Sequence, residues 1–198
     1  MSDLHADWAR FAEATASRRP LPFFDIAMDA TDGDHGGGRL AIDLGCGAGV
    51  ETLALLERGW RVFAMDSEPR AIEVLADRVP ESHQANLQTA VGRFTDVDLP
   101  KADLVYASLS LPFAVNDFDA SIDAALSAVR PGGWFVGVLL GANDTWADEV
   151  ATVDRSELNR LFSGFENLSI DAQEFDGDSG AGPKHWHWYV IRALRPVP

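Results

Sequence analysis

Hydrophobic runs of strand length alternate with helical patterns through the middle of the chain. Strands are expected near residues 39–44, 60–65, 86–92, 103–108 and 133–140, and helices near 49–58, 68–78 and 118–129. Strands that alternate with helices are joined by right-handed crossovers, which produce a parallel sheet covered by helices on both faces. The pattern therefore predicts an α/β core.

Two further helices are expected ahead of this core. Within residues 3–16 the apolar side chains recur at helical spacing, at Leu4, Trp8, Phe11 and Ala12. The Arg-Arg-Pro sequence that follows should end this helix, and residues 21–30 have the pattern of a second one. A glycine-rich loop, residues 32–38, precedes the first core strand.

The alternation changes after the last core strand. Residues 155–162 predict a helix, and residues 166–175 and 185–193 predict two strands of a hairpin that closes one edge of the sheet. With 198 residues and 46% hydrophobic side chains, the chain suits one well-buried domain. We expect this single domain, 1–198, to consist of three parts: leading helices (1–38), a cofactor-binding core (39–140) and a closing helix with a hairpin (141–198).

The chain is strongly acidic. It has 31 acidic against 16 basic side chains and a formal charge of −15, which repels phosphate backbones and anionic lipid surfaces. No apolar run reaches the roughly 18 residues of a membrane span, and the first residues have no leader pattern. We therefore expect a cytoplasmic protein that has neither nucleic acid nor a membrane as its partner. The sequence gives no signal for the oligomeric state.

The segment LAIDLGCGAGVETLALL, residues 40–56, places three glycines between a strand and a helix. Dinucleotides, nucleoside triphosphates and S-adenosylmethionine bind at turns of this kind. The glycines are Gly45, Gly47 and Gly49. In the dinucleotide fingerprint G-x-G-x-x-G that starts at Gly45, the last glycine would fall at position 50, which Val50 occupies instead. No G-K-[ST] sequence follows the glycines to hold a triphosphate.

Two carboxylates lie beside this glycine turn. Asp43 is expected at the carboxyl end of the first core strand, facing the ligand cleft, where it would repel a pyrophosphate and attract a cation. Asp66 ends the second core strand, about where an acidic residue accepts the two ribose hydroxyls of an adenosine. S-adenosylmethionine carries an ammonium and a sulfonium and has no phosphate, so Asp43 favours it as the cofactor, whereas the role of Asp66 suits both kinds of nucleotide.

The residues AIDLGCGAGVET, followed by Asp66, resemble motif I and the acidic loop of the class I S-adenosylmethionine-dependent methyltransferases. ADLVYASLSLPF and VRPGGWFVGVLL resemble the fourth and fifth strands of that family, and GPKHWHWYVI resembles the last strand of its small tellurite-resistance-like members. The resemblance implies a Rossmann-like, doubly wound, seven-stranded and mostly parallel sheet. Its strand order would be 3-2-1-4-5-7-6 with strand 7 antiparallel. Because 198 residues leave no room for a separate substrate-recognition domain, we expect the leading helices to form a lid.

The resemblance also implies further cofactor contacts. Ser67 and Glu68 would flank the ribose, Phe94 would border the adenine, and Ser108 and Leu109 would line the methionine side. Arg93 is a departure, because many members carry an acidic residue there. The full set of expected cofactor residues is Arg19, Asp43, Gly45, Cys46, Gly47, Gly49, Asp66, Ser67, Phe94, Ser108 and Leu109.

Two of those residues have a simpler explanation as well. Arg19 lies just ahead of the core, where it could meet the cofactor carboxylate or an acidic substrate, but a solvated surface position explains it equally simply. Cys46 is explained by the need for a small side chain in the turn, since the sequence places no base beside it.

A small organic molecule is the expected methyl acceptor. The residues expected at the rim of the sheet are aromatic, namely Phe24 or its neighbour Phe23, Phe113 and Trp146, and an aromatic cleft suits a small organic compound. The reaction would be a direct in-line transfer of the methyl group that yields S-adenosylhomocysteine. The alternatives are a protein that binds S-adenosylmethionine without catalysis and a nicotinamide-dependent reductase.

The HWHW sequence supplies the candidate general base. His185 is the first candidate and His187 the second, because imidazole titrates near neutrality and both rings should lie on one face of a strand. A pair of histidines without a third identifiable ligand does not suffice for a metal site, so no metal is expected.

Overall fold

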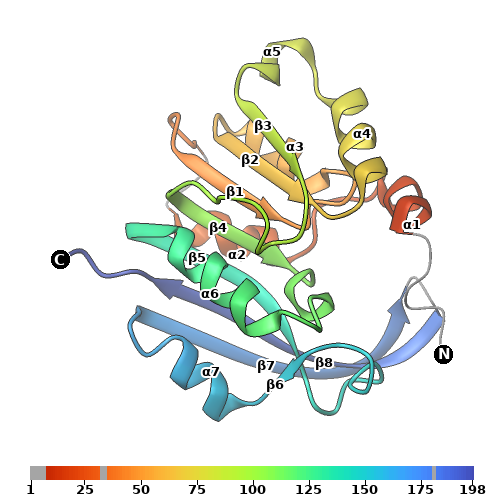
Figure 1. The fold of residues 1–198 in the computed structure, drawn as a ribbon, viewed down its shortest axis with the longest axis vertical. Coiled ribbons are helices and arrows are strands. Elements are labelled where there is room, and N and C mark those ends of the chain that lie inside the picture. The colour runs from red at the N-terminus through yellow and green to blue at the C-terminus, as the bar shows by residue number, and fades with distance from the viewer. Residues whose placement is uncertain (1–7, 32–34, 180–181) are drawn as a thin grey trace.

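The computed structural model describes residues 8–31, 35–179 and 182–198, and it contains a mixed β-sheet (Figure 1). The strand order is β3-β2-β1-β4-β5-β8-β7, with the short β6 paired to β5. Neighbouring strands from β3 to β5 are parallel, and β8 runs antiparallel to both β5 and β7. The predicted Rossmann-like sheet and its order are therefore confirmed, and β6 is an addition.

The strands have these bounds: β1 Leu40–Leu44, β2 Arg61–Asp66, β3 Leu87–Val91, β4 Ala102–Ser108, β5 Val129–Gly141, β6 Thr152–Val153, β7 Glu166–Ser179 and β8 Gly182–Leu194. The hairpin of β7 and β8 is longer than the pattern predicts. The glycine and charged residues near its tip break the alternation of polar and apolar residues, yet Asp178 still pairs with Pro183 and Ser179 with Gly182. The hairpin thus extends beyond the end of β5, as Figure 1 shows.

The helices have these bounds: α1 Trp8–Thr15, α2 Phe23–Ala30, α3 Val50–Glu57, α4 Pro69–Arg78, α5 Glu81–Gln84, α6 Phe118–Ala128 and α7 Arg155–Leu161, with a 3-10 turn, η2, at Leu111–Phe113. The first part of the helix predicted over 3–16 and part of the loop predicted over 32–38 lie outside the described residues. The short α5 was not predicted. Within the described part of the chain, no helix combines the length and the apolar character needed to cross a membrane.

The sheet is buried on both faces. On one face Leu55 of α3 and Leu75 of α4 pack with side chains of α2 and of the central strands. On the other face, Ile122 of α6 and Leu158 of α7 pack against Phe135 and its neighbours. Central strands covered on both sides need apolar side chains in both directions, which explains their continuous apolar runs.

The two leading helices have different roles. α2 packs against β4, β5 and β8, and its Phe23, Phe24 and Ala27 are buried in the core. The expectation that α2 forms part of a lid is therefore wrong, because α2 is a layer of the domain. α1 instead packs against α4, and its Ala12 is buried against Ala48 of the glycine turn. Only α1 is placed to cover the turn.

Candidate active site

The glycine turn between β1 and α3 needs glycine for two separate reasons. Gly45, Gly47 and Gly49 all have positive φ, at 70°, 51° and 73°, a conformation that costs other residues about 1–2 kcal/mol. A Cβ atom on Gly45 would lie 2.3 Å from Cβ of Ser110, and one on Gly49 would lie 2.3 Å from Cδ1 of Leu75. A Cβ on Gly47 would meet nothing within 4 Å. Packing therefore explains the outer glycines, whereas Gly47 borders open space.

Asp66 fixes the backbone of this turn. Its Oδ2 accepts a hydrogen bond from the N–H of Gly47 at 2.8 Å, and its Oδ1 accepts one from the N–H of Glu68 at 2.9 Å. Burial raises the pKa of the Asp66 carboxyl, and these backbone hydrogen bonds oppose that effect. The carboxylate thus lies beside Gly47 at the end of β2, where the sequence placed it. Glu68 caps α4 by accepting from the N–H of Arg70 at 3.0 Å.

Asp43 lies beneath the turn. Its side chain is buried, and Oδ2 accepts a hydrogen bond from the Thr52 hydroxyl at 2.6 Å. Burial above all, followed by the nearby Glu51 carboxylate, raises the pKa of Asp43 to about 7. The expectation that this carboxylate faces an open cleft is corrected, because α3 covers the face of β1 from which the side chain projects.

This raised pKa predicts how stability depends on pH. Between about pH 4 and pH 7 the folded protein holds a proton on Asp43 that the unfolded chain releases, so the free energy of unfolding should fall as pH rises through this window. A shift of about three units corresponds to about 4 kcal/mol. We expect Asp43→Asn to escape this loss. Urea unfolding of both proteins from pH 4 to pH 8 checks it, and parallel curves would contradict the assignment.

Besides Arg78, whose guanidinium donates to the carbonyl of Ala48 in the turn, the cation that lies beside the glycine turn is Arg18. Its guanidinium donates two hydrogen bonds to the Glu51 carboxylate, at 2.6 and 2.7 Å, and Glu51 also accepts from the N–H of Leu21 at 3.0 Å. Glu51 is buried, whereas Arg19 is exposed to solvent. The turn after α1 thus brings Arg18, and not the exposed Arg19, to Glu51, and a contact of Arg19 with the cofactor stays a prediction. The sequence did not indicate that Glu51 is buried and paired, because an acidic residue in the first turn of a helix is normally exposed to solvent.

Two other expected cofactor residues, Ser67 and Phe94, differ in how far they are buried. Ser67 is exposed directly after Asp66. Phe94 packs beside the hydrophobic cluster on the α6 face of the sheet. Arg93 is exposed, and it pairs with Asp96 at 2.9 Å and with Asp117 at 3.3 Å. The guanidinium of Arg93 is therefore already engaged by two acids.

The carboxyl end of β4 is a strained segment next to the turn. Leu109 has a φ of 57°, in the left-handed region that most residues avoid. The hydroxyl of Ser110 donates to the carbonyl of Leu44 at 2.6 Å, which ties this segment to the end of β1. Cys46 is buried in the turn, and burial raises the pKa of its thiol well above the usual range. A buried, protonated thiol is unreactive, as the sequence indicated.

An aromatic cluster extends from α1 across the carboxyl ends of β4 and β5. We define it as Trp8, Phe23, Phe113, Trp146, Trp186 and Trp188. Its ring centroids form successive pairs at 4.9 Å (Trp8 and Phe113), 6.1 Å (Phe113 and Trp146), 5.4 Å (Trp146 and Trp186), 5.0 Å (Trp186 and Trp188) and 5.0 Å (Trp188 and Phe23). The structure thus brings the expected Phe113 and Trp146 together. The cluster also contains Trp186 and Trp188 of β8, which the sequence pattern did not indicate.

Phe24 does not belong to this cluster. Its side chain is only 1% exposed, and its ring packs edge-on against Tyr106 with centroids 6.2 Å apart. Phe24 was expected to line the acceptor site, and this expectation is wrong. The reason is that α2 turns Phe24 into the core and sets its neighbour Phe23 against Trp188.

A buried ion pair holds two of the tryptophans. Lys184 pairs with Asp144, and its Nζ lies 3.5 Å from the ring centroid of Trp146 and 3.8 Å from that of Trp186. The other oxygen of Asp144 accepts from the N–H of His187 at 3.1 Å. Burial lowers the pKa of Lys184, and the Asp144 carboxylate opposes this. The pair joins the loop after β5 to β8 and fixes both indole rings.

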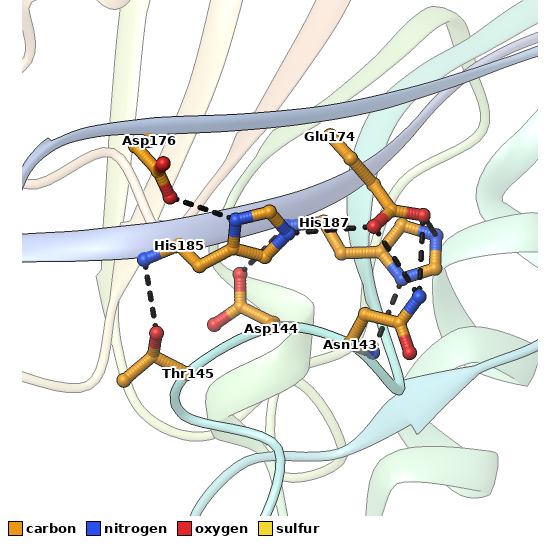
Figure 2. A network of polar contacts seen from close by, with 7 residues as sticks. All are labelled: Asn143, Asp144, Thr145, Glu174, Asp176, His185 and His187. Atoms are coloured by element: carbon orange, nitrogen blue, oxygen red, sulfur yellow. Dashed lines mark hydrogen bonds and ion pairs between the residues drawn. The ribbon is translucent and has the colours of Figure 1, made fainter.

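The two histidines take part in a polar network that shares Asp144 with this ion pair (Figure 2). His185 contacts Asp176 through Nδ1 at 2.8 Å and Glu174 through Nε2 at 3.3 Å, and these two carboxylates, Asp176 foremost, raise its pKa. Nδ1 of His187 accepts from the N–H of Asn143 at 3.2 Å. Among the residues that the structure describes, no group of three or more His, Cys, Asp or Glu side chains is arranged to hold a metal ion.

His185 and His187 lie on the face of β8 opposite the aromatic cluster. Alternate residues of a strand point to opposite faces, and Trp186 and Trp188 project toward the cluster. Tyr189, which shares the side of the histidines, packs in the core on the α6 face. The structure therefore does not bring the expected bases to the expected acceptor residues.

Comparison with known proteins identifies the core of the chain. Residues 41–133 match the family model described as a methyltransferase domain, and this range contains the glycine turn, Asp66 and β4. The core of the chain is therefore similar to a methyltransferase domain. Its strand order, with an antiparallel strand inserted beside β5, agrees with that family.

The methyltransferase domain is similar to parts of larger curated proteins. Over 70 residues it is 37% identical to the magnesium-protoporphyrin O-methyltransferase of Rhodobacter capsulatus, a match that covers 35% of this chain and 31% of the relative. Other relatives are named as ribosomal RNA and ribosomal protein L11 methyltransferases. The chain spans between 31% and 45% of the length of the curated relatives it matches.

Solved structures share the fold of the methyltransferase domain. TehB from Haemophilus influenzae superposes with a TM-score of 0.72 at 17% identity, over 93% of this chain and 65% of TehB. The 1,6-didemethyltoxoflavin-N1-methyltransferase of Burkholderia thailandensis, solved with its acceptor and S-adenosylhomocysteine, gives a TM-score of 0.68 at 20% identity over 98% of this chain and 84% of that one. These likenesses confirm the architecture that the resemblance implied.

Proposed function

We propose that this protein binds S-adenosylmethionine at the glycine turn and transfers its methyl group to a small organic acceptor. The observation that carries the proposal is Gly47, which has a positive φ and borders open space beside the carboxylate of Asp66. A backbone without side chains lets an adenosine approach closely, and a carboxylate at the end of β2 can accept its ribose hydroxyls. The family match supports the same cofactor.

The charges around the turn suit this cofactor. Asp66 and Asp43 supply negative charge at the turn, although Asp43, with a pKa of about 7, is only partly ionised at neutral pH. Arg18 is engaged with Glu51, and Arg78 is hydrogen-bonded to the carbonyl of Ala48. Negative charge at this place attracts an ammonium and a sulfonium and disfavours a pyrophosphate. When bound, S-adenosylmethionine supplies an electrophilic methyl group. The chain would contribute by holding this methyl group and the acceptor in line, an effect worth up to about 7–11 kcal/mol.

The aromatic cluster supports a small acceptor. Trp146, Trp186 and Trp188 present apolar, planar surfaces next to Leu109 at the end of β4. The net charge of −15 opposes a nucleic acid as the acceptor. A fold neighbour acts on a small heterocyclic compound according to its name, 1,6-didemethyltoxoflavin-N1-methyltransferase. We do not carry His185 and His187 forward as general bases, because they lie on the other face of β8.

A methyl-transfer screen tests the proposed function. Labelled S-adenosylmethionine is incubated with the protein and with phenols, amines, thiols, carboxylates and neutral heterocycles, and label transfer is measured. We expect turnover with at least one class, and we expect Asp66→Asn to bind S-adenosylhomocysteine at least tenfold more weakly. Asp103→Asn is the control, since Asp103 also accepts from a backbone N–H, that of Leu40, but at the opposite end of the sheet. Tight cofactor binding without turnover would instead support a non-catalytic binding protein.

A further inference from the structure

Three buried polar groups without a hydrogen-bond partner lie on one face of the sheet. They are the hydroxyls of Tyr106 and Ser108 and the indole N–H of Trp188, none of which makes a hydrogen bond of normal geometry among the described residues, although the Ser108 hydroxyl lies close enough to lower the pKa of Tyr106. Tyr106 and Ser108 are two residues apart on β4 and therefore share a face, and Trp188 packs on that same face from β8. A buried polar group without a partner costs about 1–3 kcal/mol. These groups therefore indicate a place where a ligand supplies what the protein lacks.

The surroundings of these groups are aromatic. Phe23 of α2 lies against Trp188, with ring centroids 5.0 Å apart. Trp186 continues this lining on β8, 5.0 Å from Trp188. Flat, apolar side chains of this kind favour a planar ligand.

The charges nearby disfavour an anionic ligand. Asp43 is the register partner of Tyr106 on the adjacent strand, and Glu51 lies close enough to affect the same phenol. The guanidinium of Arg18 is paired with Glu51, whereas Asp43 accepts a hydrogen bond from the hydroxyl of Thr52. Burial first, and then Glu51, raise the pKa of Tyr106 well above its usual range. The phenol therefore stays protonated at neutral pH and can donate a hydrogen bond.

The three groups also share a hydrogen-bonding preference. An indole N–H can only donate, and a protonated phenol or a serine hydroxyl can donate as well. Ser108 is followed directly by Leu109 and Ser110, and Ser110 is hydrogen-bonded to the strand that leads into the glycine turn. Two of the donors, Tyr106 and Ser108, thus lie on the strand whose end is tied to the proposed cofactor site.

We propose that Tyr106, Ser108 and Trp188 line the acceptor subsite, and that the acceptor is an uncharged, planar compound that carries carbonyl oxygens or ring nitrogens. The donors would bind oxygens or nitrogens that do not receive the methyl group, and so orient the atom that does. This inference rests on the proposed function, because that function places the methyl donor at the adjacent glycine turn.

Three probe compounds of similar flat shape test the ligand class. The protein is saturated with S-adenosylhomocysteine and titrated separately with lumiflavin, which is neutral and carries carbonyls, with naphthoate and with naphthylmethylammonium. Quenching of tryptophan emission and calorimetry report the affinity. We expect lumiflavin to bind at least about tenfold more tightly than either charged probe. No binding of lumiflavin, or equal binding of a charged probe, would overturn the proposal.

Two matched variants test the residues. Tyr106→Phe removes a single donor, and we expect about a two- to tenfold weaker affinity for lumiflavin, the loss typical of one hydrogen bond. The urea midpoint should be unchanged or higher, because the deleted hydroxyl has no partner. Ser121→Ala is the control, since it removes another unpartnered buried hydroxyl from α6 on the opposite face, and its lumiflavin affinity should equal that of the wild type.

The outcomes separate this inference from the proposed function. If Tyr106→Phe binds lumiflavin as tightly as the wild type, or if Ser121→Ala weakens binding to the same extent, the subsite is wrongly placed. If the wild type binds S-adenosylhomocysteine and not lumiflavin, only this inference fails. If it does not bind S-adenosylhomocysteine at all, the proposed function fails first.

Discussion

Gly47→Ala is expected to weaken the binding of S-adenosylhomocysteine at least 100-fold while the protein stays folded. The added Cβ would meet no protein atom within 4 Å, so it would project into the space where the cofactor is proposed to lie. The positive φ of 51° adds a strain of about 1–2 kcal/mol, which most single domains tolerate. Calorimetric titration gives the affinity, and circular dichroism with urea unfolding confirms the fold.

Gly38→Ala is the matched control for this experiment. Gly38 also has a positive φ, of 79°, and a Cβ there would meet nothing within 4 Å, but Gly38 precedes β1 at the opposite end of the sheet from the turn. The two variants should therefore lose similar stability, and only Gly47→Ala should lose affinity. If Gly47→Ala bound like the wild type, the open space beside the turn would not be the cofactor site.

Lys184→Met is expected to lower the free energy of unfolding by about 3–5 kcal/mol. The substitution leaves the buried Asp144 without its ammonium partner, and removal of one member of a buried ion pair has costs of this size. Lys184 also contacts the rings of Trp146 and Trp186, so their fluorescence should change together with the stability. Urea unfolding monitored by tryptophan emission measures both.

The double variant Lys184→Met with Asp144→Asn separates charge from packing. Removal of both charges should restore most of the lost stability, because no uncompensated charge stays buried. A double variant as unstable as the single one would show that packing against the tryptophans, and not the charge, is what Lys184 contributes. In either case the result reports how firmly the aromatic cluster is fixed before an acceptor binds.

The sequence predicted the fold more completely than the site. The alternation of apolar runs and helical patterns located β1 to β5, α3, α4, α6 and the closing hairpin, because strands buried on both faces and amphipathic helices leave strong periodic signals. The glycine turn and Asp66 were equally clear, since both depend on backbone geometry within a short segment. The four-residue α5 and the two-residue β6 are too short to leave a pattern.

The side chains that depend on tertiary packing could not be predicted. The helical pattern of α2 shows that it has an apolar face but not which layer covers it, and so Phe24 was placed in the acceptor site. The period of two on β8 correctly put His185 and His187 on one face but could not say that Trp186 and Trp188 face the cluster. The choice of Arg18 over Arg19 depends on one turn after α1. The cytoplasmic location and the small-molecule acceptor stay predictions.

The central claim is that the glycine turn binds S-adenosylmethionine, and a calorimetric titration of the wild-type protein with S-adenosylhomocysteine, and separately with NADH, tests it most directly. We expect saturable binding of S-adenosylhomocysteine in the micromolar range and no binding of NADH, because Val50 replaces the last glycine of the dinucleotide fingerprint and the partly ionised Asp43 beneath the turn disfavours a pyrophosphate. Binding of NADH without binding of S-adenosylhomocysteine would contradict it.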